Sequence, residues 1–347
     1  MTLSSRLILV LSIVAFPYCL AICLAISLQR QAHRLLWSSP CLGKKAIRHL
    51  IVLVPSFNVA ATIERALKDV RTDPRTALVV VVDGGSTDGT ADAARASAGS
   101  QPQAACSNKR AAAPVVVVEA TDGVSGRANC LNLAACVATE WLTEQHAGTA
   151  ELAGEQSDDA YLFLHADTVL PEGFGSAVVE ALEDGRAAYG SFKIFTRGVR
   201  DSPSFLVRSF SRFANQLNNL RSSWMEAPYG DQGLFCRRST FERVGGFPSV
   251  PLMEDSAFCW EARKHGSCCI LRDHVQSFAS PQWGALGALY VLRNYFLLTM
   301  WAIGVLSPEH IHELYYVGRR LPQRIAYSEM ACQYGKTPQE LLRNHRR

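Results

Sequence analysis

Apolar and polar residues alternate in blocks along the first half of the chain. Four runs rich in Val, Ile and Leu predict strands at 49–55, 78–83, 115–118 and 160–167. The segments around them have helical spacing and predict helices at 60–71, 90–98, 126–141 and 172–184. Continuous apolar strands are typical of a parallel sheet covered by helices on both faces. The predicted fold class is therefore α/β, with a mostly parallel sheet flanked by helices.

The second half has a less regular pattern. Strands are expected at 189–195 and 228–238, and helices at 203–222 and 255–266. The apolar block 283–306 is long enough to cross a membrane, but Arg293 and Asn294 stand at its centre. An arginine there costs about 2.5–3.5 kcal/mol on insertion scales. We expect a helix packed on the domain or lying on the membrane surface, with a second span as the alternative.

The N-terminal segment 7–28 contains no charged residue and is long enough to cross a bilayer. It predicts a single-pass anchor, and a cleaved signal peptide is the alternative. More basic residues follow the segment than precede it, so the body should face the cytosol; a Golgi or ER lumenal body is the alternative. The expected divisions are an anchor (1–30), a basic linker (31–48), one α/β domain (49–282), and an apolar, interfacial helix with a basic tail (283–347).

Charge is distributed unevenly along the 347 residues. Residues 1–48 carry +6 and residues 319–347 carry +5, so the body between them carries −7 within a net charge of +4. An acidic body argues against nucleic acid as a partner, and basic ends beside apolar segments favour a membrane. The 11 cysteines include no CxxC pair, which argues against a zinc motif or a disulfide framework.

Polar side chains follow three of the predicted strands. The carboxyl ends of parallel strands share one edge, where α/β proteins bind ligands. Each group alone is also compatible with an ordinary helix cap. Together the three groups predict a shared crevice. The residues are Ser56 and Asn58 after the first strand, Asp83 and Ser86 after the second, and His165 and Asp167 after the fourth.

These residue types suit a sugar nucleotide. Asp83 can accept hydrogen bonds from a base or ribose, and Arg127 opens a helix whose N-terminus favours phosphate. Asp167 can hold Mg²⁺ or Mn²⁺, which a diphosphate leaving group requires. Glu254 and Asp255 begin another helix, where a carboxylate can act as general base or simply complement the helix dipole.

Seven segments carry a family resemblance in order over residues 50–265. They are VLVPSFN, VVDGGSTDGT, GRANCLN, FLHAD, GDQGLFCRR, VGGFP and LMED. The chain resembles glycosyltransferase family 2, whose members have the GT-A nucleotide-diphospho-sugar transferase fold. The combination of HADT, PYGDQG and PLMED resembles an uncharacterised subgroup labelled selenodomain-associated transferase 2.

The resemblance implies an inverting, metal-dependent transferase of hexosyltransferase type that uses a nucleoside-diphosphate sugar. Asp255 matches the catalytic base, with Glu254 beside it, and Asp167 matches the metal ligand of the DXD motif. The acceptor would meet Tyr229, Asp231 and Gln232, and a lipid or lipid-linked acceptor is expected at a membrane. The donor-binding set is Pro55, Ser56, Asn58, Asp83, Gly85, Ser86, Arg127, Asn132, His165 and Asp167.

Two positions depart from the family pattern. Val59 follows Asn58 where an acidic residue is usual, and His165 replaces the first Asp of DXD. The QxxRW motif of processive synthases is absent, so processive polymerisation is not expected. A non-catalytic membrane protein that binds sugar nucleotides and a nucleotidyltransferase stay open as alternatives.

Overall fold

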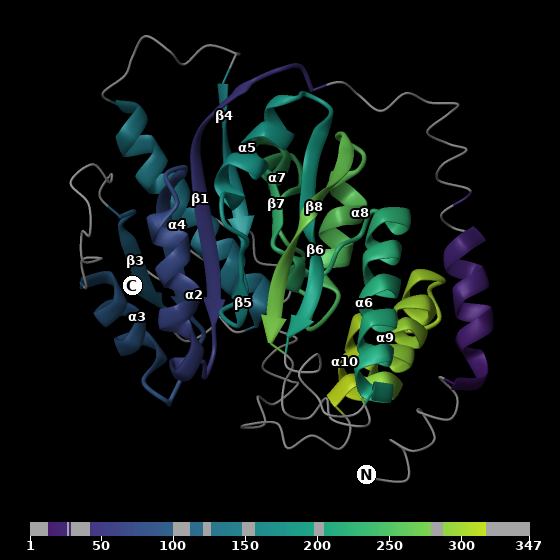
Figure 1. Cartoon of the computed structure of the whole chain (residues 1–347). Coiled ribbons are helices and arrows are strands. Elements are labelled where there is room, and N and C mark those ends of the chain that lie inside the picture. Colours follow the sequence, from purple (N-terminus) through teal and green to yellow (C-terminus); the bar gives the residue numbers. More distant parts are fainter. Residues whose placement is uncertain are drawn as a thin grey trace.

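A computed structural model describes residues 13–25, 28, 42–99, 112–120, 126–147, 157–197, 205–278 and 287–316. Its strands form one sheet through the centre of the molecule (Figure 1). The strands are β1 (Ala46–Ser56), β2 (Thr76–Asp83), β3 (Val115–Glu119), β4 (Ser157–Phe163), β5 (Thr168–Val169), β6 (Ala187–Arg197), β7 (Leu234–Arg237) and β8 (Ser267–Phe278). The helices are α2 (Ala60–Thr72), α3 (Thr90–Gly99), α4 (Arg127–Ala147), α5 (Phe174–Glu183), α6 (Phe205–Met225), the 3-10 turn η1 (Gly230–Gln232), α7 (Arg238–Val244), α8 (Glu254–Ala262), α9 (Gly287–Ala302) and α10 (Pro308–Tyr316).

The sheet has the order β3-β2-β1-β4-β7-β6-β8-β5. The first four strands in this order are parallel, as predicted. The second half is mixed, because β7 pairs antiparallel with β4 and β6, while β8 is parallel to β6 and antiparallel to β5. The expectation of a mostly parallel sheet therefore describes the first half well and the whole sheet less well.

Strand β1 has apolar side chains on both faces, so it separates two cores. Ile51 and Leu53 face a core shared with α4, α8 and α9, whereas Val52 and Val54 face one shared with α2 and α5. A one-residue slip in register would exchange these two sets. The parallel alignment that brings the strand ends together is thus fixed by burial on both sides.

An aromatic cluster fixes the second half of the domain against the first. The ring centroids of Phe163 on β4 and Phe247 lie 4.8 Å apart, and those of Phe247 and Phe258 on α8 are also 4.8 Å apart. Phe241 on α7 lies 5.6 Å from Phe163 and closes the group. Such pairs add about 0.5–1.5 kcal/mol each beyond their buried area. The cluster therefore holds the start of α8 close to the end of β4.

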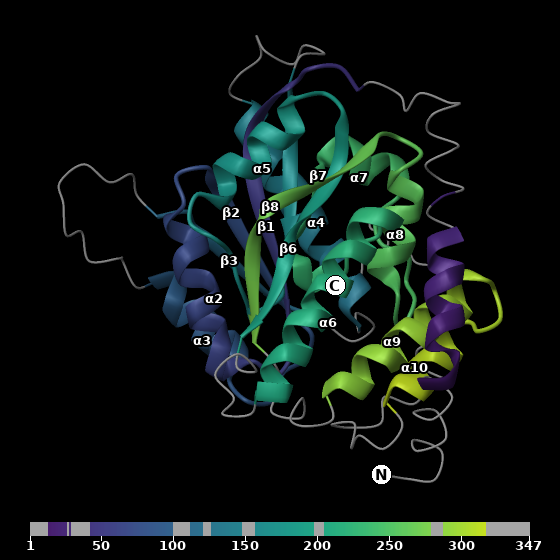
Figure 2. The same cartoon turned by 45° about the vertical axis from the view of Figure 1, so that its right-hand side comes forward.

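The N-terminal segment is helical over 13–25 and packs on the domain. Cys23 Sγ lies 3.7 Å from Thr299 Oγ1, and the rings of Phe16 and Tyr295 are 6.0 Å apart. Figures 1 and 2 both show this helix beside α9. None of the helices in the described part of the chain is long and apolar enough to cross a membrane. The rest of the predicted anchor 7–28, except residue 28, lies outside the described residues, as does the tail after residue 316.

Several second-half elements differ from the sequence prediction. The sequence pattern predicts neither strand β8 nor the short helix α7. Helix α9 is shorter than the predicted 283–306 and packs on the domain, with Leu297 and Leu298 fully buried. The guanidinium of the central Arg293 donates there from Nη1 to the Tyr315 carbonyl at 3.1 Å. Helix α9 is thus confirmed as a packed helix.

The aromatic cluster generates a stability prediction. Phe258→Ala removes a fully buried ring from the centre of the cluster, and we expect unfolding free energy to fall by about 3–5 kcal/mol. Urea unfolding followed by circular dichroism measures the change. Phe213→Ala, at a position 48% exposed on α6, is the matched control and should change stability by less than about 0.5 kcal/mol. Equal effects at both positions would contradict the assignment of the core.

Candidate active site

The ends of β1 and β2 hold a buried carboxylate in a fixed orientation. Asp83 is 2% exposed and accepts hydrogen bonds from the backbone N–H of Ser86 at 2.8 Å and from its hydroxyl at 2.5 Å. The Ser56 hydroxyl donates to the same carboxylate at 3.2 Å. Charge-assisted bonds of this kind stabilise an ionised carboxylate away from water. Ser56, Asp83 and Ser86 therefore form one unit, as the sequence predicted.

The two loops after these strands are bonded to each other. The backbone N–H of Asn58 donates to Ser86 Oγ at 2.8 Å, and the Asn58 side chain accepts from the Thr87 N–H at 3.0 Å. Asn58 has φ 52°, a left-handed conformation that asparagine tolerates well, and Gly85 has φ 86°. Pro55 stays within β1, opposite Val82. The two loops thus form one hydrogen-bonded unit at the ends of β1 and β2.

Arg127 connects three elements of the site. It is the first residue of α4, and its Nε forms an ion pair with Glu254 Oε1 at the start of α8. Its Nη1 lies 3.5 Å from His165 Nε2, after β4. Burial and the adjacent guanidinium lower the pKa of His165 to about 3, so this imidazole is neutral at physiological pH. A neutral imidazole can accept a hydrogen bond or bind a cation.

Asp255 is held by backbone donors at the start of α8. It is 6% exposed, and its two oxygens accept from the N–H groups of Gly230 at 2.7 Å and Ser256 at 2.6 Å. A Cβ at position 230 would lie 2.8 Å from His165 Nε2. A glycine at position 230 therefore allows the His165 ring and the Asp255 carboxylate to pack against the same point of the backbone.

Asp231 contributes a third carboxylate at this point. Its Oδ1 is buried and has no hydrogen-bond donor within the described residues. Burial, together with the nearby Asp255 and Asp167 carboxylates, raises the pKa of Asp231 to about 7. Desolvation also raises the pKa of Asp167, although its side chain is open to solvent. An unpaired buried carboxylate oxygen indicates a donor or cation that binds there.

The site has an excess of negative charge. Four carboxylates, those of Asp167, Asp231, Glu254 and Asp255, interact with only two guanidinium groups, Arg127 and Arg221. The imbalance is two charges when all are ionised, which equals the charge of one divalent cation. Carboxylate oxygens are also the ligands that Mg²⁺ and Mn²⁺ prefer. These residue types suit such a cation, although no three of their ligand atoms are gathered within 4.8 Å of one another in the described residues.

Three other predicted site residues contact the backbone or side chains that shape the site. Asn132 accepts from the Phe247 N–H at 2.9 Å and donates to its carbonyl at 2.8 Å. Gln232 is 1% exposed and bonds Ser222, Tyr229 and the Phe192 carbonyl. Tyr229 lies under the Arg221 guanidinium, 3.6 Å from ring centroid to Cζ. Their roles toward donor and acceptor stay predictions.

Sequence reasoning missed a second polar group, His49, His146 and Asp159, whose ligand-type atoms all lie within 4.8 Å of one another. These residues are far apart in the sequence, so no local motif marks them. Histidine and aspartate at the start of a strand are individually unremarkable. Only the pairing of β1 with β4 brings them together.

The raised pKa of Asp231 generates a pH prediction. Its pKa is about 7 in the fold against an ordinary 3.8. The protonated carboxyl therefore stabilises the fold below about pH 4, and this contribution is lost as pH rises from about 4 to about 7. Without divalent cations, Asp231→Asn should match wild type near pH 4. It should become more stable than wild type by up to about 4 kcal/mol above pH 7. Urea unfolding across this range measures the difference. A difference that does not change with pH would contradict the assignment, and the exposed Asp273→Asn serves as control.

Comparisons with known proteins concern the β1–β2 region and the overall fold. The sequence profile of Glycosyl transferase family 2 matches residues 51–107. The mannosyltransferase PcManGT from Pyrobaculum calidifontis, solved with GDP-Man and Mn²⁺, has a TM-score of 0.52 and 20% identity, covering 94% of this chain and 85% of that chain. TM-scores are 0.45 for two further structures. S. aureus TarS 1–349 has 14% sequence identity, and the match covers 81% of this chain and 76% of that chain. Mycobacterium tuberculosis glucosyl-3-phosphoglycerate synthase has 18% sequence identity, and the match covers 75% of this chain and 81% of that chain.

No curated protein matches the sequence significantly. The family match covers the β1–β2 region, which contains Ser56, Asp83 and Ser86. The fold comparison extends over most of the chain. The chain thus contains a β1–β2 region similar to Glycosyl transferase family 2 and has a GT-A-like fold.

Proposed function

We propose that the protein transfers a sugar from a nucleoside-diphosphate sugar to a hydroxyl acceptor, with inversion and with Mg²⁺ or Mn²⁺ bound. The grouping of the Asp167, Asp231, Glu254 and Asp255 carboxylates, in which one buried Asp231 oxygen has no hydrogen-bond partner among the described residues, is the observation that carries this proposal. An acidic site would repel a nucleoside diphosphate unless a cation shared it. The Mn²⁺ and GDP-Man of the PcManGT complex support the same combination.

The donor would bind along the ends of β1, β2 and β4. Asp83 accepts hydrogen bonds from the nucleoside, with its carboxylate fixed by Ser56 and Ser86. The N-terminus of α4 and the Arg127 guanidinium attract the diphosphate. Arg127 stays paired with Glu254 on its Nε side. Its other nitrogens are the groups that would meet phosphate.

Asp167 would hold the divalent cation, with Asp231 and the neutral His165 as neighbouring ligand-type groups. When bound, the cation neutralises the charge that develops on the leaving diphosphate. The cation would also compensate the buried negative charge of Asp231. His165 replaces a carboxylate at this edge and so keeps the excess at two charges.

Asp255 would act as general base toward the acceptor hydroxyl. The acceptor oxygen forms a bond to the anomeric carbon as the bond from that carbon to the β-phosphate oxygen breaks on the opposite face. The hydroxyl proton passes to Asp255, and the nucleoside diphosphate leaves. A positioned base of this kind contributes about 10²–10⁴-fold in rate.

Two variants test donor binding and proton transfer separately. Thermal shifts against a panel of nucleotide sugars, with and without Mn²⁺, identify the donor, because a ligand at 100 times its Kd adds about 2.7 kcal/mol of stability. Asp167→Ala should lose the Mn²⁺-dependent part of this shift. Asp255→Asn should keep the shift and release nucleoside diphosphate about 10²–10⁴ times more slowly. Glu254→Gln keeps an oxygen that accepts from the Arg127 Nε–H and so preserves the position of Asp255, and it should slow release less.

The retained thermal shift is an essential control, because Asn at 255 turns one N–H toward the backbone donors of Gly230 or Ser256. Near wild-type turnover in Asp255→Asn would contradict the base assignment. Donor binding with no turnover in wild type would favour a non-catalytic binding protein. Release of pyrophosphate would indicate a nucleotidyltransferase instead.

We also propose that the protein is a membrane protein with a lipid or lipid-linked acceptor. Helix α6 exposes Phe205, Phe213, Leu220 and Trp224 by 36–70%, and their spacing places them within an arc of about 100°. The uncharged helix 13–25 exposes Val14 and Tyr18 by 65% and 70%. An apolar surface of this kind is favoured at a lipid boundary.

Membrane attachment predicts a defined extraction behaviour. The full chain should stay in the membrane pellet at alkaline pH and should need detergent for release, because its N-terminal apolar segment buries hydrocarbon surface in lipid. Release by alkaline carbonate alone would contradict integral attachment. A glycan on a sequon engineered near residue 105 would place the body in the lumen, whereas its absence in a chain that is otherwise competent for glycosylation agrees with a cytosolic body.

A further inference from the structure

A second cluster of ligand-type side chains lies at the end of the sheet where strands β1 and β4 begin. His49 is near the start of β1 and Asp159 near the start of β4, whereas the candidate active site follows the ends of these strands. Seven residues separate His49 from Ser56 along β1, which corresponds to roughly 23 Å of extended strand. His146, near the end of α4, completes the group. It is therefore separate from the Asp167 region.

The three side chains have distances compatible with metal ligation. His49 Nδ1 lies 2.9 Å from Asp159 Oδ1, and His146 Nε2 lies 3.8 Å from Asp159 Oδ2. A tetrahedral ion with bonds of about 2.1 Å places its ligand atoms about 3.4 Å apart. The observed separations lie on both sides of this value. Small side-chain rotations would bring all three atoms to one ion.

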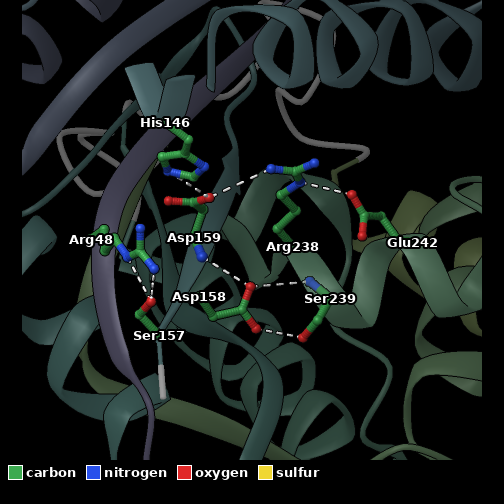
Figure 3. Close-up of a pocket in the computed structure, with 8 residues that line it drawn as sticks. All are labelled: Arg48, His146, Ser157, Asp158, Asp159, Arg238, Ser239 and Glu242. Atoms are coloured by element: carbon green, nitrogen blue, oxygen red, sulfur yellow. Dashed lines mark hydrogen bonds and ion pairs between the residues drawn. The ribbon is translucent and has the colours of Figure 1, made fainter. Parts of the chain in front are cut away.

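The surroundings leave access for an ion and for a fourth ligand. Asp159 is 4% exposed, whereas the side chains of His49 and His146 are 27% and 32% exposed. A cavity of about 220 Å³ opens beside Asp159 and His146 (Figure 3). A water molecule there can complete the coordination, as in sites with three protein ligands.

The charges around the cavity allow a cation despite two arginines. Arg238 lies 3.6 Å from Asp159 Oδ2 and donates to Glu242 at 2.7 Å, so its charge is compensated. Figure 3 shows Arg238 between Asp159 and Glu242. With Asp158 and Arg48 counted, the lining has three carboxylates and two guanidinium groups. Arg238 is thus placed as an outer ion-pair partner of the ligating carboxylate.

We propose that His49, His146 and Asp159 bind one Zn²⁺ ion. Two imidazole nitrogens and one carboxylate favour Zn²⁺ over Mg²⁺, which prefers oxygen ligands. The ion would connect the starts of β1 and β4 with the end of α4, the helix whose first residue is Arg127. Its effect would be structural, because no residue of the candidate active site lies in the group.

Zinc binding to the full chain in detergent tests this proposal. After chelation and dialysis, wild type should bind one Zn²⁺ per chain by titration calorimetry, and Zn²⁺ should raise Tm where Mg²⁺ does not. His146→Gln changes a partly exposed side chain and should weaken Zn²⁺ affinity by at least about 100-fold. Asp159→Asn should do the same. Asp167→Ala should keep this Zn²⁺ site, so its result is independent of the proposed transfer reaction.

Two controls separate the site from adventitious zinc. His274→Gln, on exposed β8 surface, should leave Zn²⁺ binding unchanged. Cys268→Ser tests whether the adjacent thiols at 268 and 269 bind the ion instead. Failure of wild type to bind stoichiometric Zn²⁺ would overturn the proposal, and so would binding that survives in His146→Gln and Asp159→Asn. The cluster would then be a hydrogen-bond network around Asp159.

Discussion

The ion pair between Arg127 and Glu254 connects the two halves of the domain. Arg127 begins α4 in the parallel half, and Glu254 begins α8, 127 residues later. Glu254 is 2% exposed, and desolvation raises its pKa even though Arg127 opposes the shift. The Arg127 side chain is 37% exposed and Glu254 is the buried partner, so removing Arg127 would leave a buried carboxylate uncompensated. The position of Asp255 depends on this pair, since it follows Glu254 in the same helical turn.

The sequence predicted the first half of the fold because burial on both faces leaves a clear signal. The apolar runs of β1 and β2 have this property, whereas β3 is an edge strand in which only Val118 is buried, and all three strands are confirmed. Strand β8 could not be recognised in the same way. Arg272, Asp273 and His274 lie exposed within it and interrupt the apolar pattern. Its pairing with β6 is a tertiary effect that local propensity does not contain.

The candidate site shows the same division between local and distant information. The sequence located the strand ends and the start of α8, because glycine-rich turns and acidic residues mark them. It could not show that Arg127 pairs with Glu254, or that Asp231 has an unpaired buried oxygen. The group His49, His146 and Asp159 is a similar case, since 110 residues separate His49 from Asp159. Such contacts follow from the strand order, and no motif carries them.

The packing of the N-terminal helix on α9 determines how the domain can move. Cys23 meets Thr299, and Phe16 meets Tyr295, so the helix 13–25 and the domain form one body at this contact. A flexible tether would let the catalytic face turn in any direction and sample a range of heights. A packed helix instead fixes the angle between its own axis and the sheet. Under the membrane attachment proposed above, the distance between the candidate active site and an acceptor would be set by the geometry of this contact and not by the length of a linker.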